Sequence, residues 1–303
     1  CHSEKLFRGL NISQNEFFKT HLNKYNVIFL DIQWMYGNAL EEMKRNSTLK
    51  VVSYIQEQVL AELRNEYSEC VRADDISLPS VLAKINVKTK EQFIIIIDEW
   101  DALFREVKEA EDVQKEYLQL LRGLFKSSLT DKMIEGAYIT GILPIKKYGT
   151  QSALTDFREY TMLQPKKLAK YTGFTETEVK LLCQDYGMDF EEAKRWYDGY
   201  SFHQIKSIYS PNSIIQAVQN EEFGDYWTET ETYESLKYYI NYNLDGLKDA
   251  IISMLGGEKY RINIRTFQND LTSLKNKDDV MTLLVHLGYL AYDSTAKEVY
   301  IPN

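Results

Sequence analysis

The sequence predicts an α/β fold: a three-layer core with a parallel sheet between helices, followed by a mainly helical region and a small C-terminal module. Five consecutive apolar residues, Phe93–Ile97, have the pattern of a strand that is buried on both faces. Strand patterns alternate with helical patterns from Val27 to Thr140, which is the order of a parallel sheet with helical crossovers. The patterns become mainly helical beyond Pro165, where we expect the core to end.

The composition is that of a globular protein with room for more than one core. Of the 303 residues, 44% are hydrophobic and 27% are charged, which is enough apolar material for packed domains. The formal net charge of −9 does not favour broad binding to nucleic acid or to an anionic membrane, although it leaves room for a local basic patch. No run approaches the roughly 18 apolar residues of a membrane-spanning helix, and the N-terminus has no signal-peptide core, so we expect a cytoplasmic protein.

The first elements of the core follow from the spacing of apolar residues. Gln14–Leu22 has the pattern of a short amphipathic helix, and Val27–Ile32 is a nearly all-apolar run typical of a buried strand. Apolar side chains then recur at helical spacing across Leu40–Tyr67, and Asp74–Ile85 predicts a shorter helix. A long helical crossover therefore leads to the second strand.

The second strand, Phe93–Ile97, is the one that we expect at the centre of the sheet. An exposed isoleucine would lose the roughly 1.5–3 kcal/mol of stabilisation that burial gives, so we expect other elements to pack on both faces of this strand. A helical stretch follows as far as Ser127, and Ala137–Thr140 predicts the third strand. These elements complete the predicted core.

The region beyond the core begins with a helix start signal. Thr175–Glu178 is a capping box, and Phe190–Trp196 predicts a second helix. Asp198–Gly199 lies between aromatic pairs and predicts the turn of a hairpin. Helical patterns then continue to Leu255 and include Tyr233–Ile240.

The last segment predicts a small module with the element order of a winged helix. Thr266–Leu274 and Asp278–Leu287 have helical patterns, and Gly288–Ile301 predicts a hairpin. We therefore expect three domains, which are an α/β core over residues 1–165, a helical lid region over residues 166–250 and a winged-helix-like module over residues 251–303.

Two adjacent acids, Asp98 and Glu99, are the strongest candidates for a functional site. They follow the central strand at its carboxyl end, where open parallel sheets bind ligands. In a nucleotide hydrolase, the first acid would hold Mg²⁺, and the second would orient and deprotonate the attacking water. The alternative is structural, because a carboxylate near a helix N-terminus is favourable by about 0.3–1 kcal/mol, and Asp101 has such a position as well.

Three further polar residues lie near the same predicted edge of the sheet. Thr140 ends the third strand, where its hydroxyl could bind a water or a phosphate, although threonine is also a common strand residue. Lys146 follows in a loop, and Arg158 could contact phosphate in this subunit or a neighbouring one. A solvated surface position is the alternative for both cations.

The sequence contains no phosphate-binding loop of the form G-x-x-x-x-G-K-[ST] and no Gly-Lys dipeptide. Without the N–H donors and the lysine of such a loop, the acids alone would repel a polyanionic nucleotide. We therefore expect no ATP or Mg²⁺ to bind tightly to this chain alone. The three cysteines and four histidines are scattered, which favours structural thiols and ordinary packing over a zinc site.

Several motifs occur in one order along the chain. They are Phe93–Asp101, Thr140–Gly149, Ser152–Leu154, Trp196–Phe202 and His286–Leu290. Together they resemble the bacterial predicted AAA-ATPase-like family, which consists of P-loop NTPases of the ASCE class. The resemblance extends over nearly the whole chain.

The resemblance implies ATP and Mg²⁺ as ligands of the intact protein. It makes Asp98 the Mg²⁺-binding acid and Glu99 the water-activating acid of the Walker B strand, and it makes Thr140 a sensor of the γ-phosphate. In the family, a Walker A loop of the form R-R-F-G-K-[ST] lies just upstream of the segment that Leu6–Leu10 resembles, so it would fall before Cys1. Many members also have a PD-(D/E)XK nuclease-like domain, which would follow Asn303.

Three functions stay open from the sequence. The first is the core and lid of an AAA-type ATPase, inactive in this chain alone because it lacks the Walker A loop. The second is a nonenzymatic module on a degenerate NTPase fold that binds a protein partner or itself through aromatic segments such as Tyr226–Trp227 and Tyr238–Tyr239. The third is a metal-dependent nuclease that uses Asp98, Glu99 and Lys146.

Overall fold

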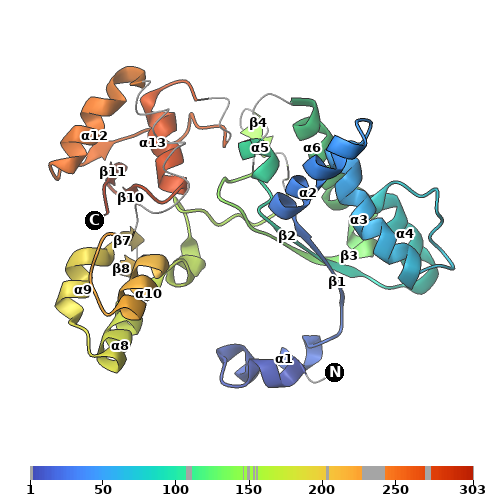
Figure 1. The fold of residues 1–303 in the computed structure, drawn as a ribbon, viewed down its shortest axis with the longest axis horizontal. Coiled ribbons are helices and arrows are strands. Elements are labelled where there is room, and N and C mark those ends of the chain that lie inside the picture. The colour runs from blue at the N-terminus through green and yellow to red at the C-terminus, as the bar shows by residue number, and fades with distance from the viewer. Residues whose placement is uncertain are drawn as a thin grey trace. The chain divides into compact units, whose positions relative to one another are not determined.

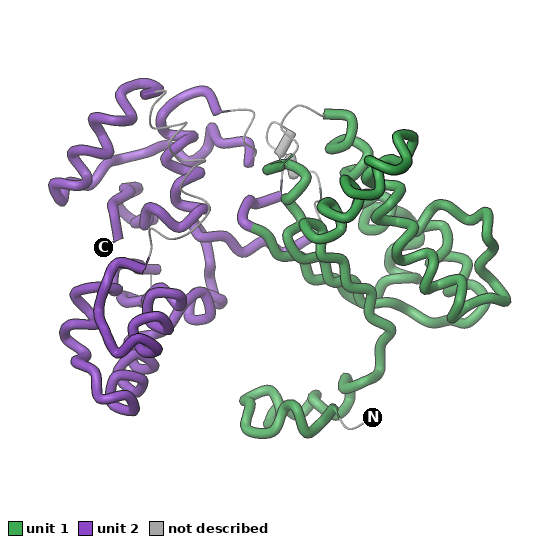
Figure 2. The backbone as a smooth tube through the Cα atoms, viewed as in Figure 1, with its two compact units in different colours: residues 1–141, 153–156 green, residues 142–152, 157–303 purple. Residues whose placement is uncertain are grey.

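The computed structural model of the protein describes residues 3–106, 111–145, 147–148, 151–152, 154, 156–202, 205–226, 243–269 and 274–302. The chain forms two compact units, which Figure 2 draws in different colours. The first unit comprises residues 1–141 and 153–156, and the second comprises residues 142–152 and 157–303. The predicted domain boundaries at residues 165 and 250 stay predictions.

The first unit contains a three-stranded parallel sheet. Its strands β1 (Asn26–Asp31), β2 (Phe93–Asp98) and β3 (Ile134–Ile139) lie in the order β1-β2-β3. The isoleucine-rich strand β2 is therefore central and parallel to both neighbours, as the sequence predicts. Asp31 and Asp98 are partners in the register of β1 and β2, so both strands end at the same level.

Helices connect the three strands, as the alternating patterns predict. The predicted helical span Leu40–Tyr67 is two helices, because the chain is not helical between Asn46 and Lys50. The first crossover contains α2 (Ile32–Arg45), α3 (Val51–Glu66) and α4 (Leu78–Thr89), and the second contains α5 (Ala102–Glu106), α6 (Glu111–Phe125) and α7 (Thr130–Met133).

The predicted three-layer arrangement is wrong for the described residues, which form two layers. Helices α3, α4 and α6 gather on one side of the strands (Figure 1). On the other face of the sheet, Val27 is 55%, Phe29 is 56% and Tyr138 is 61% exposed. The strand order explains the difference. When successive parallel strands are added in one direction, right-handed crossovers place every connecting helix on the same face.

The segment before β1 has little regular structure. It contains the 3₁₀ helices η1 (Ser3–Phe7) and η2 (Asn11–Gln14) and the single-turn helix α1 (Phe18–His21). The sequence instead predicts one helix over Gln14–Leu22. Across the ranges that the structure describes, no helix combines the length and the apolar character needed to cross a membrane.

The second unit begins with a short antiparallel pair and a small antiparallel sheet. The predicted capping box at Thr175 is confirmed. The Thr175 side chain accepts a hydrogen bond from the backbone N–H of Glu178, and the Glu178 carboxylate accepts one from the backbone N–H of Thr175. The strands of the sheet lie in the order β6-β8-β7. The elements are β4 (Lys147–Tyr148), β5 (Gln151–Ser152), η3 (Lys166–Tyr171), β6 (Phe174–Thr175), α8 (Glu176–Tyr186), α9 (Phe190–Tyr197), β7 (Asp198–Phe202), β8 (Ile205–Tyr209) and α10 (Pro211–Asn220).

The predicted hairpin exists, but its turn is not at Asp198–Gly199. These two residues begin strand β7, which pairs with β8, so the chain reverses after Phe202. Gly199 has a packing role instead. A Cβ atom added there would lie 1.9 Å from the carbonyl oxygen of Pro302. The glycine is therefore needed for close approach of two backbones and not for a tight turn.

The end of the chain forms a second small sheet with helices. Strands β10 and β11 are an antiparallel hairpin, as predicted, and β9 extends it in the order β10-β11-β9. The predicted span Tyr233–Ile240 lies outside the described residues. The elements are η4 (Leu244–Gly246), α12 (Leu247–Leu255), β9 (Tyr260–Arg261), α13 (Lys277–His286), β10 (Ala291–Asp293) and β11 (Glu298–Tyr300).

The predicted helix over Thr266–Leu274 is wrong in its described part, because residues 266–269 are not helical. Side-chain hydrogen bonds hold this segment in another conformation. The hydroxyl of Thr266 donates to Asp279 at 2.6 Å, and the amide of Asn269 donates to the carbonyl of Ile145 at 2.9 Å. Asn269 also has a φ of 60°, which lies outside the helical region.

Candidate functional site

Acidic and hydroxyl side chains meet where the three parallel strands of the first unit end. Asp31 is the last residue of β1, Asp98 is the last residue of β2, and Thr140 directly follows β3. The backbone ties the last two together, because Thr140 N donates to the carbonyl of Ile97 at 2.9 Å. Trp100 N in turn donates to the carbonyl of Thr140 at 3.0 Å. The segments after β2 and β3 therefore form one connected edge.

The carboxylate of Asp98 is held in a fixed orientation. Its Oδ1 atom accepts from the backbone N–H of Glu99 at 3.0 Å and from the hydroxyl of Thr140. Its Oδ2 atom accepts no hydrogen bond from the described residues. One oxygen of Asp98 is thus anchored, while the other is open to a further ligand.

The backbone of Glu99 is in a conformation that few residues other than glycine adopt. Its φ is 50°, in the left-handed region, where such residues cost free energy and often occur at functional sites. Its side chain is 35% exposed and forms an ion pair with the guanidinium of Arg105. Burial raises the pKa of Glu99, the nearby carboxylates Asp101, Asp98 and Asp31 raise it further, and Arg105 opposes them.

Behind this edge lies a buried ion pair. The carboxylate of Asp101 is fully buried, and its Oδ2 atom lies 3.2 Å from Nε of Arg105. Gly141 allows this packing, because a Cβ atom there would lie 2.5 Å from both Asp101 Oδ1 and Trp100 Cδ1. The sequence-based interpretation of Asp101 as a helix cap missed its pairing with Arg105.

Asp31 is the other member of this edge that sequence reasoning missed. Its Oδ1 atom accepts from Trp34 N at 2.9 Å and so caps helix α2. A signal for it was present, because Asp31 ends the first apolar strand pattern in the same way that Asp98 ends the second. Arg105 had no comparable signal, since a cation on a short amphipathic helix is normally a surface residue.

The structure brings together three of the five predicted site residues, namely Asp98, Glu99 and Thr140. Lys146 lies outside the described residues, and Arg158 is exposed and belongs to the second unit. No group of three or more His, Cys, Asp or Glu side chains placed to hold a metal ion occurs within the described ranges. The catalytic and ligand-binding roles of all five residues stay predictions.

The donor set nevertheless fits a Mg²⁺ ion that is shared with a nucleotide. Mg²⁺ prefers oxygen ligands and keeps several waters, so it is often bound through one or two carboxylates together with phosphate oxygens. The open oxygen of Asp98 would supply one such ligand. The neighbouring Glu99 offers a carboxylate with a raised pKa, a property suited to accepting a proton from water.

Comparisons with known proteins support a family for the first half of the chain. Residues 2–150 match a family model described as predicted AAA-ATPase. A curated relative, the uncharacterized protein in the vnfD 5' region of Azotobacter chroococcum mcd 1, is 22% identical over 238 residues. That match covers 76% of this chain and 43% of the relative, so the chain spans less than half the length of the relative. No solved structure matches the chain significantly.

Proposed function

Because residues 2–150 belong to the predicted AAA-ATPase family, we propose that this chain supplies the acidic half of an ATP-binding and ATP-hydrolysing site in the whole protein. One observation carries the proposal. Asp98, Glu99 and Thr140 are joined by hydrogen bonds at the carboxyl end of the central parallel strand. Ligands of open parallel sheets bind at this end.

In this proposal, Asp98 holds Mg²⁺ through its open oxygen, and Thr140 keeps the carboxylate in place. Bound Mg²⁺ would neutralise charge on the phosphates and on the leaving group. We also propose that Thr140 senses the γ-phosphate, and the hydrogen bond between its hydroxyl and Asp98 supports this role. Loss of the phosphate would then be transmitted to Asp98 through that bond.

Glu99 acts in the proposal as the base that orients and deprotonates the attacking water. Its raised pKa favours this role, because a base with a pKa nearer the working pH accepts a proton more effectively. The ion pair with Arg105 opposes it. We therefore propose that Glu99 leaves Arg105 when the nucleotide binds and that the guanidinium then remains with Asp101.

The phosphates need cationic and N–H donors that the four acids of this edge do not supply. The 303 residues contain no G-x-x-x-x-G-K-[ST] motif, so the proposal concerns the whole protein and not this chain alone. Lys146 and Arg158 are proposed as additional phosphate ligands. A helical lid over residues 166–250 and a winged-helix-like module over residues 251–303 complete the proposed architecture, and the order α12, β9, α13, β10, β11 supports that module.

The proposal is tested by replacing Glu99 with glutamine in the whole protein. Glu99→Gln is expected to retain ATP binding and to lower the rate of ATP hydrolysis by about 10² or more, the range for loss of a general base. Glu106→Gln is the matched control, because it removes an exposed carboxylate from the neighbouring helix α5. Steady-state hydrolysis and fluorescent-nucleotide binding measure the two effects. Equal hydrolysis rates in both variants would refute the role of Glu99.

A further inference from the structure

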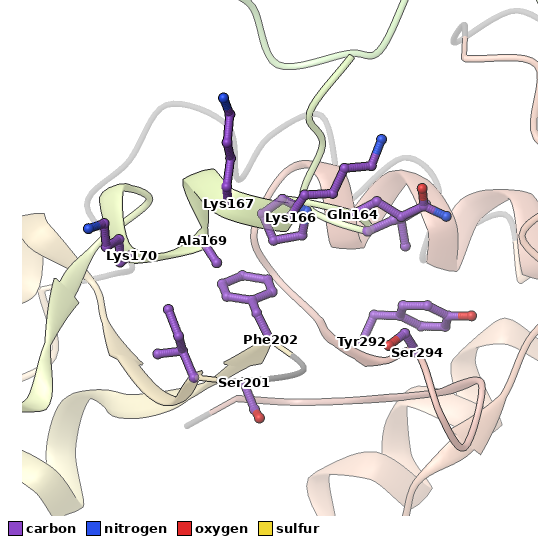
Figure 3. A pocket seen from close by; sticks show the side chains of 12 residues that line it. Gln164, Lys166, Lys167, Ala169, Lys170, Ser201, Phe202, Tyr292 and Ser294 are labelled. Atoms are coloured by element: carbon purple, nitrogen blue, oxygen red, sulfur yellow. The ribbon is translucent and has the colours of Figure 1, made fainter. Parts of the chain in front are cut away.

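The second unit contains a pocket of about 640 Å³, formed by segments that are far apart in the sequence. Its walls come from the 3₁₀ helix η3, the hairpin β7–β8 and the strand β10 (Figure 3). The apolar lining includes Leu163, Ala169, Phe202, Ile205 and Tyr292. This volume lies within the range of small-molecule sites, which are about 300–1,000 Å³ and mostly apolar.

The walls of the pocket are fixed by packing beneath it. Tyr200 and Ala291, from β7 and β10, share a buried cluster with Ile208, and Phe202 packs against that cluster. The hydroxyl of Tyr200 donates to the carbonyl of Gly288. Apolar contacts therefore join β7 to β10, and a hydrogen bond joins β7 to the segment before β10, which hold these two walls in place.

Three lysines of η3 lie on one wall of this pocket. Lys166, Lys167 and Lys170 are exposed lining residues, and in Figure 3 their side chains extend away from the rings of Phe202 and Tyr292. None of the three forms an ion pair with a carboxylate of the described residues. The backbone carbonyl of Glu159 lies 3.5 Å from Nζ of Lys166. Nζ of Lys166 lies 5.8 Å from the ring centroid of Tyr160, and Nζ of Lys170 lies 4.8 Å from that of Tyr171. These partners are uncharged, so no carboxylate of the described residues neutralises the three positive charges.

The combination of an apolar, aromatic lining and a wall with three lysines defines the chemistry of a ligand. A neutral apolar molecule would not use the lysines, and a bare inorganic anion would not fill the cavity. In a protein with a net charge of −9, three neighbouring lysines without a carboxylate partner among the described residues also make a local site of attraction for anions. We propose that the pocket binds a small organic anion, with its aromatic body beside Phe202 and Tyr292 and its acidic group at the lysines.

This site is independent of the proposed ATPase site, because none of its lining residues belongs to the unit that contains Asp98. Two fluorescent probes test it on the chain of 303 residues. Anilinonaphthalene sulfonate has an aromatic body and an anionic group, and N-phenylnaphthylamine has nearly the same body without the charge. We expect one site for the sulfonate and weaker binding of the neutral probe.

A triple variant, Lys166→Gln, Lys167→Gln and Lys170→Gln, tests the role of the charges. It is expected to weaken sulfonate binding about tenfold, the scale of three exposed charge interactions, and to leave binding of the neutral probe unchanged. Lys248→Gln, at an exposed position of α12 in the same unit, is the control for loss of a lysine. Unchanged sulfonate affinity in the triple variant would overturn the proposal.

The interior of the pocket is tested separately. Ala169→Leu adds volume to a buried wall and should weaken both probes, while Phe202→Leu should weaken both and keeps an apolar side chain that preserves folding. Asp98→Asn should change neither affinity. Binding that is lost in Asp98→Asn and kept in the pocket variants would place the probe in the first unit and contradict the proposal.

Discussion

Glu99 connects the local backbone to the proposed chemistry. The backbone N–H of Glu99 donates to Asp98, and a left-handed φ of 50° at Glu99 turns the chain directly after the central strand. The same turn leaves the Glu99 side chain partly buried beside three other carboxylates, and its pKa rises. The ion pair with Arg105 opposes this rise in pKa. A single residue therefore orients one acid and is itself made a stronger base.

Replacing Arg105 tests how strongly its charge opposes the rise in the pKa of Glu99. Arg105→Gln removes the cation that lowers the pKa of Glu99, while burial and the neighbouring carboxylates still raise it. The pKa of Glu99 is therefore expected to rise further above its ordinary value. Carboxyl carbon NMR of selectively labelled glutamate measures this titration, with Glu99→Gln identifying the signal. A pKa that is unchanged or lowered would show that Arg105 does not control this carboxylate.

Gly141 should tolerate no side chain, because it packs against the residues behind the site. Gly141→Ala would place a methyl group 2.5 Å from Asp101 Oδ1 and from Trp100 Cδ1, and neither buried group can move freely. We expect a loss of about 1–3 kcal/mol in the free energy of unfolding. Urea denaturation measures it. Gly37→Ala is the control, since its added methyl meets nothing within 4 Å and should stabilise helix α2.

The candidate site was only partly predictable from individual residues. Asp98 and Glu99 follow an apolar strand, and that pattern is visible in any sequence that has it. The ion pair of Arg105 with Asp101 was not visible, because it depends on where a short helix places one cation. Asp31 carries the same signal as Asp98 but was interpreted only as the end of a strand. Tertiary contacts decide these cases, and sequence spacing does not record them.

At the scale of elements, the side chains on the two faces of β1 differ strongly in how far they are buried. Leu30 is 1% exposed against the helices, whereas its neighbour Phe29 is 56% exposed on the open face of the sheet. Phe29 lies opposite Ile96 in the register, which in turn lies opposite Tyr138. The sheet therefore has one buried face and one partly exposed apolar face.

This difference predicts opposite outcomes for two substitutions in one strand. Leu30→Ala should lower the free energy of unfolding by about 2–5 kcal/mol, as for other buried leucines. Phe29→Ala should lower it by less, about 1–2 kcal/mol, because more than half of that side chain stays in water on folding. Urea denaturation of the two variants measures both. A large loss in Phe29→Ala would mean that the open face is covered in solution.

The strands of the parallel sheet were predicted correctly from their apolar runs, whereas helix bounds and elements that depend on a few side-chain contacts were not. The isoleucine run correctly indicated a central parallel strand, although only one of its faces is fully buried, because Ile94 and Ile96 lie on the open face. Asp198–Gly199 was misread as a turn because the glycine is required by Pro302, far along the chain. Thr266–Asn269 was misread as a helix because hydrogen bonds to Asp279 and Ile145 override its periodicity.

At the scale of the whole molecule, the chain separates into two compact units with different proposed tasks. The first presents acids at the end of a parallel sheet, and the second contains the pocket with the three lysines of η3. The overall fold class was predictable because alternating strand and helix patterns extend over the first unit. The number of layers was not, because the cover of a sheet depends on the spatial order of its strands and not on their patterns.

The binding of a divalent ion tests the central claim most directly, because the account makes Asp98 a ligand of the nucleotide's metal. Mn²⁺ replaces Mg²⁺ at such sites, and electron paramagnetic resonance counts the free ion during titration of the whole protein with ATP present. Asp98→Asn is expected to weaken Mn²⁺ binding about tenfold or more, while Asp74→Asn, at an exposed position, should leave it unchanged. Equal Mn²⁺ affinity in the two variants would contradict the account.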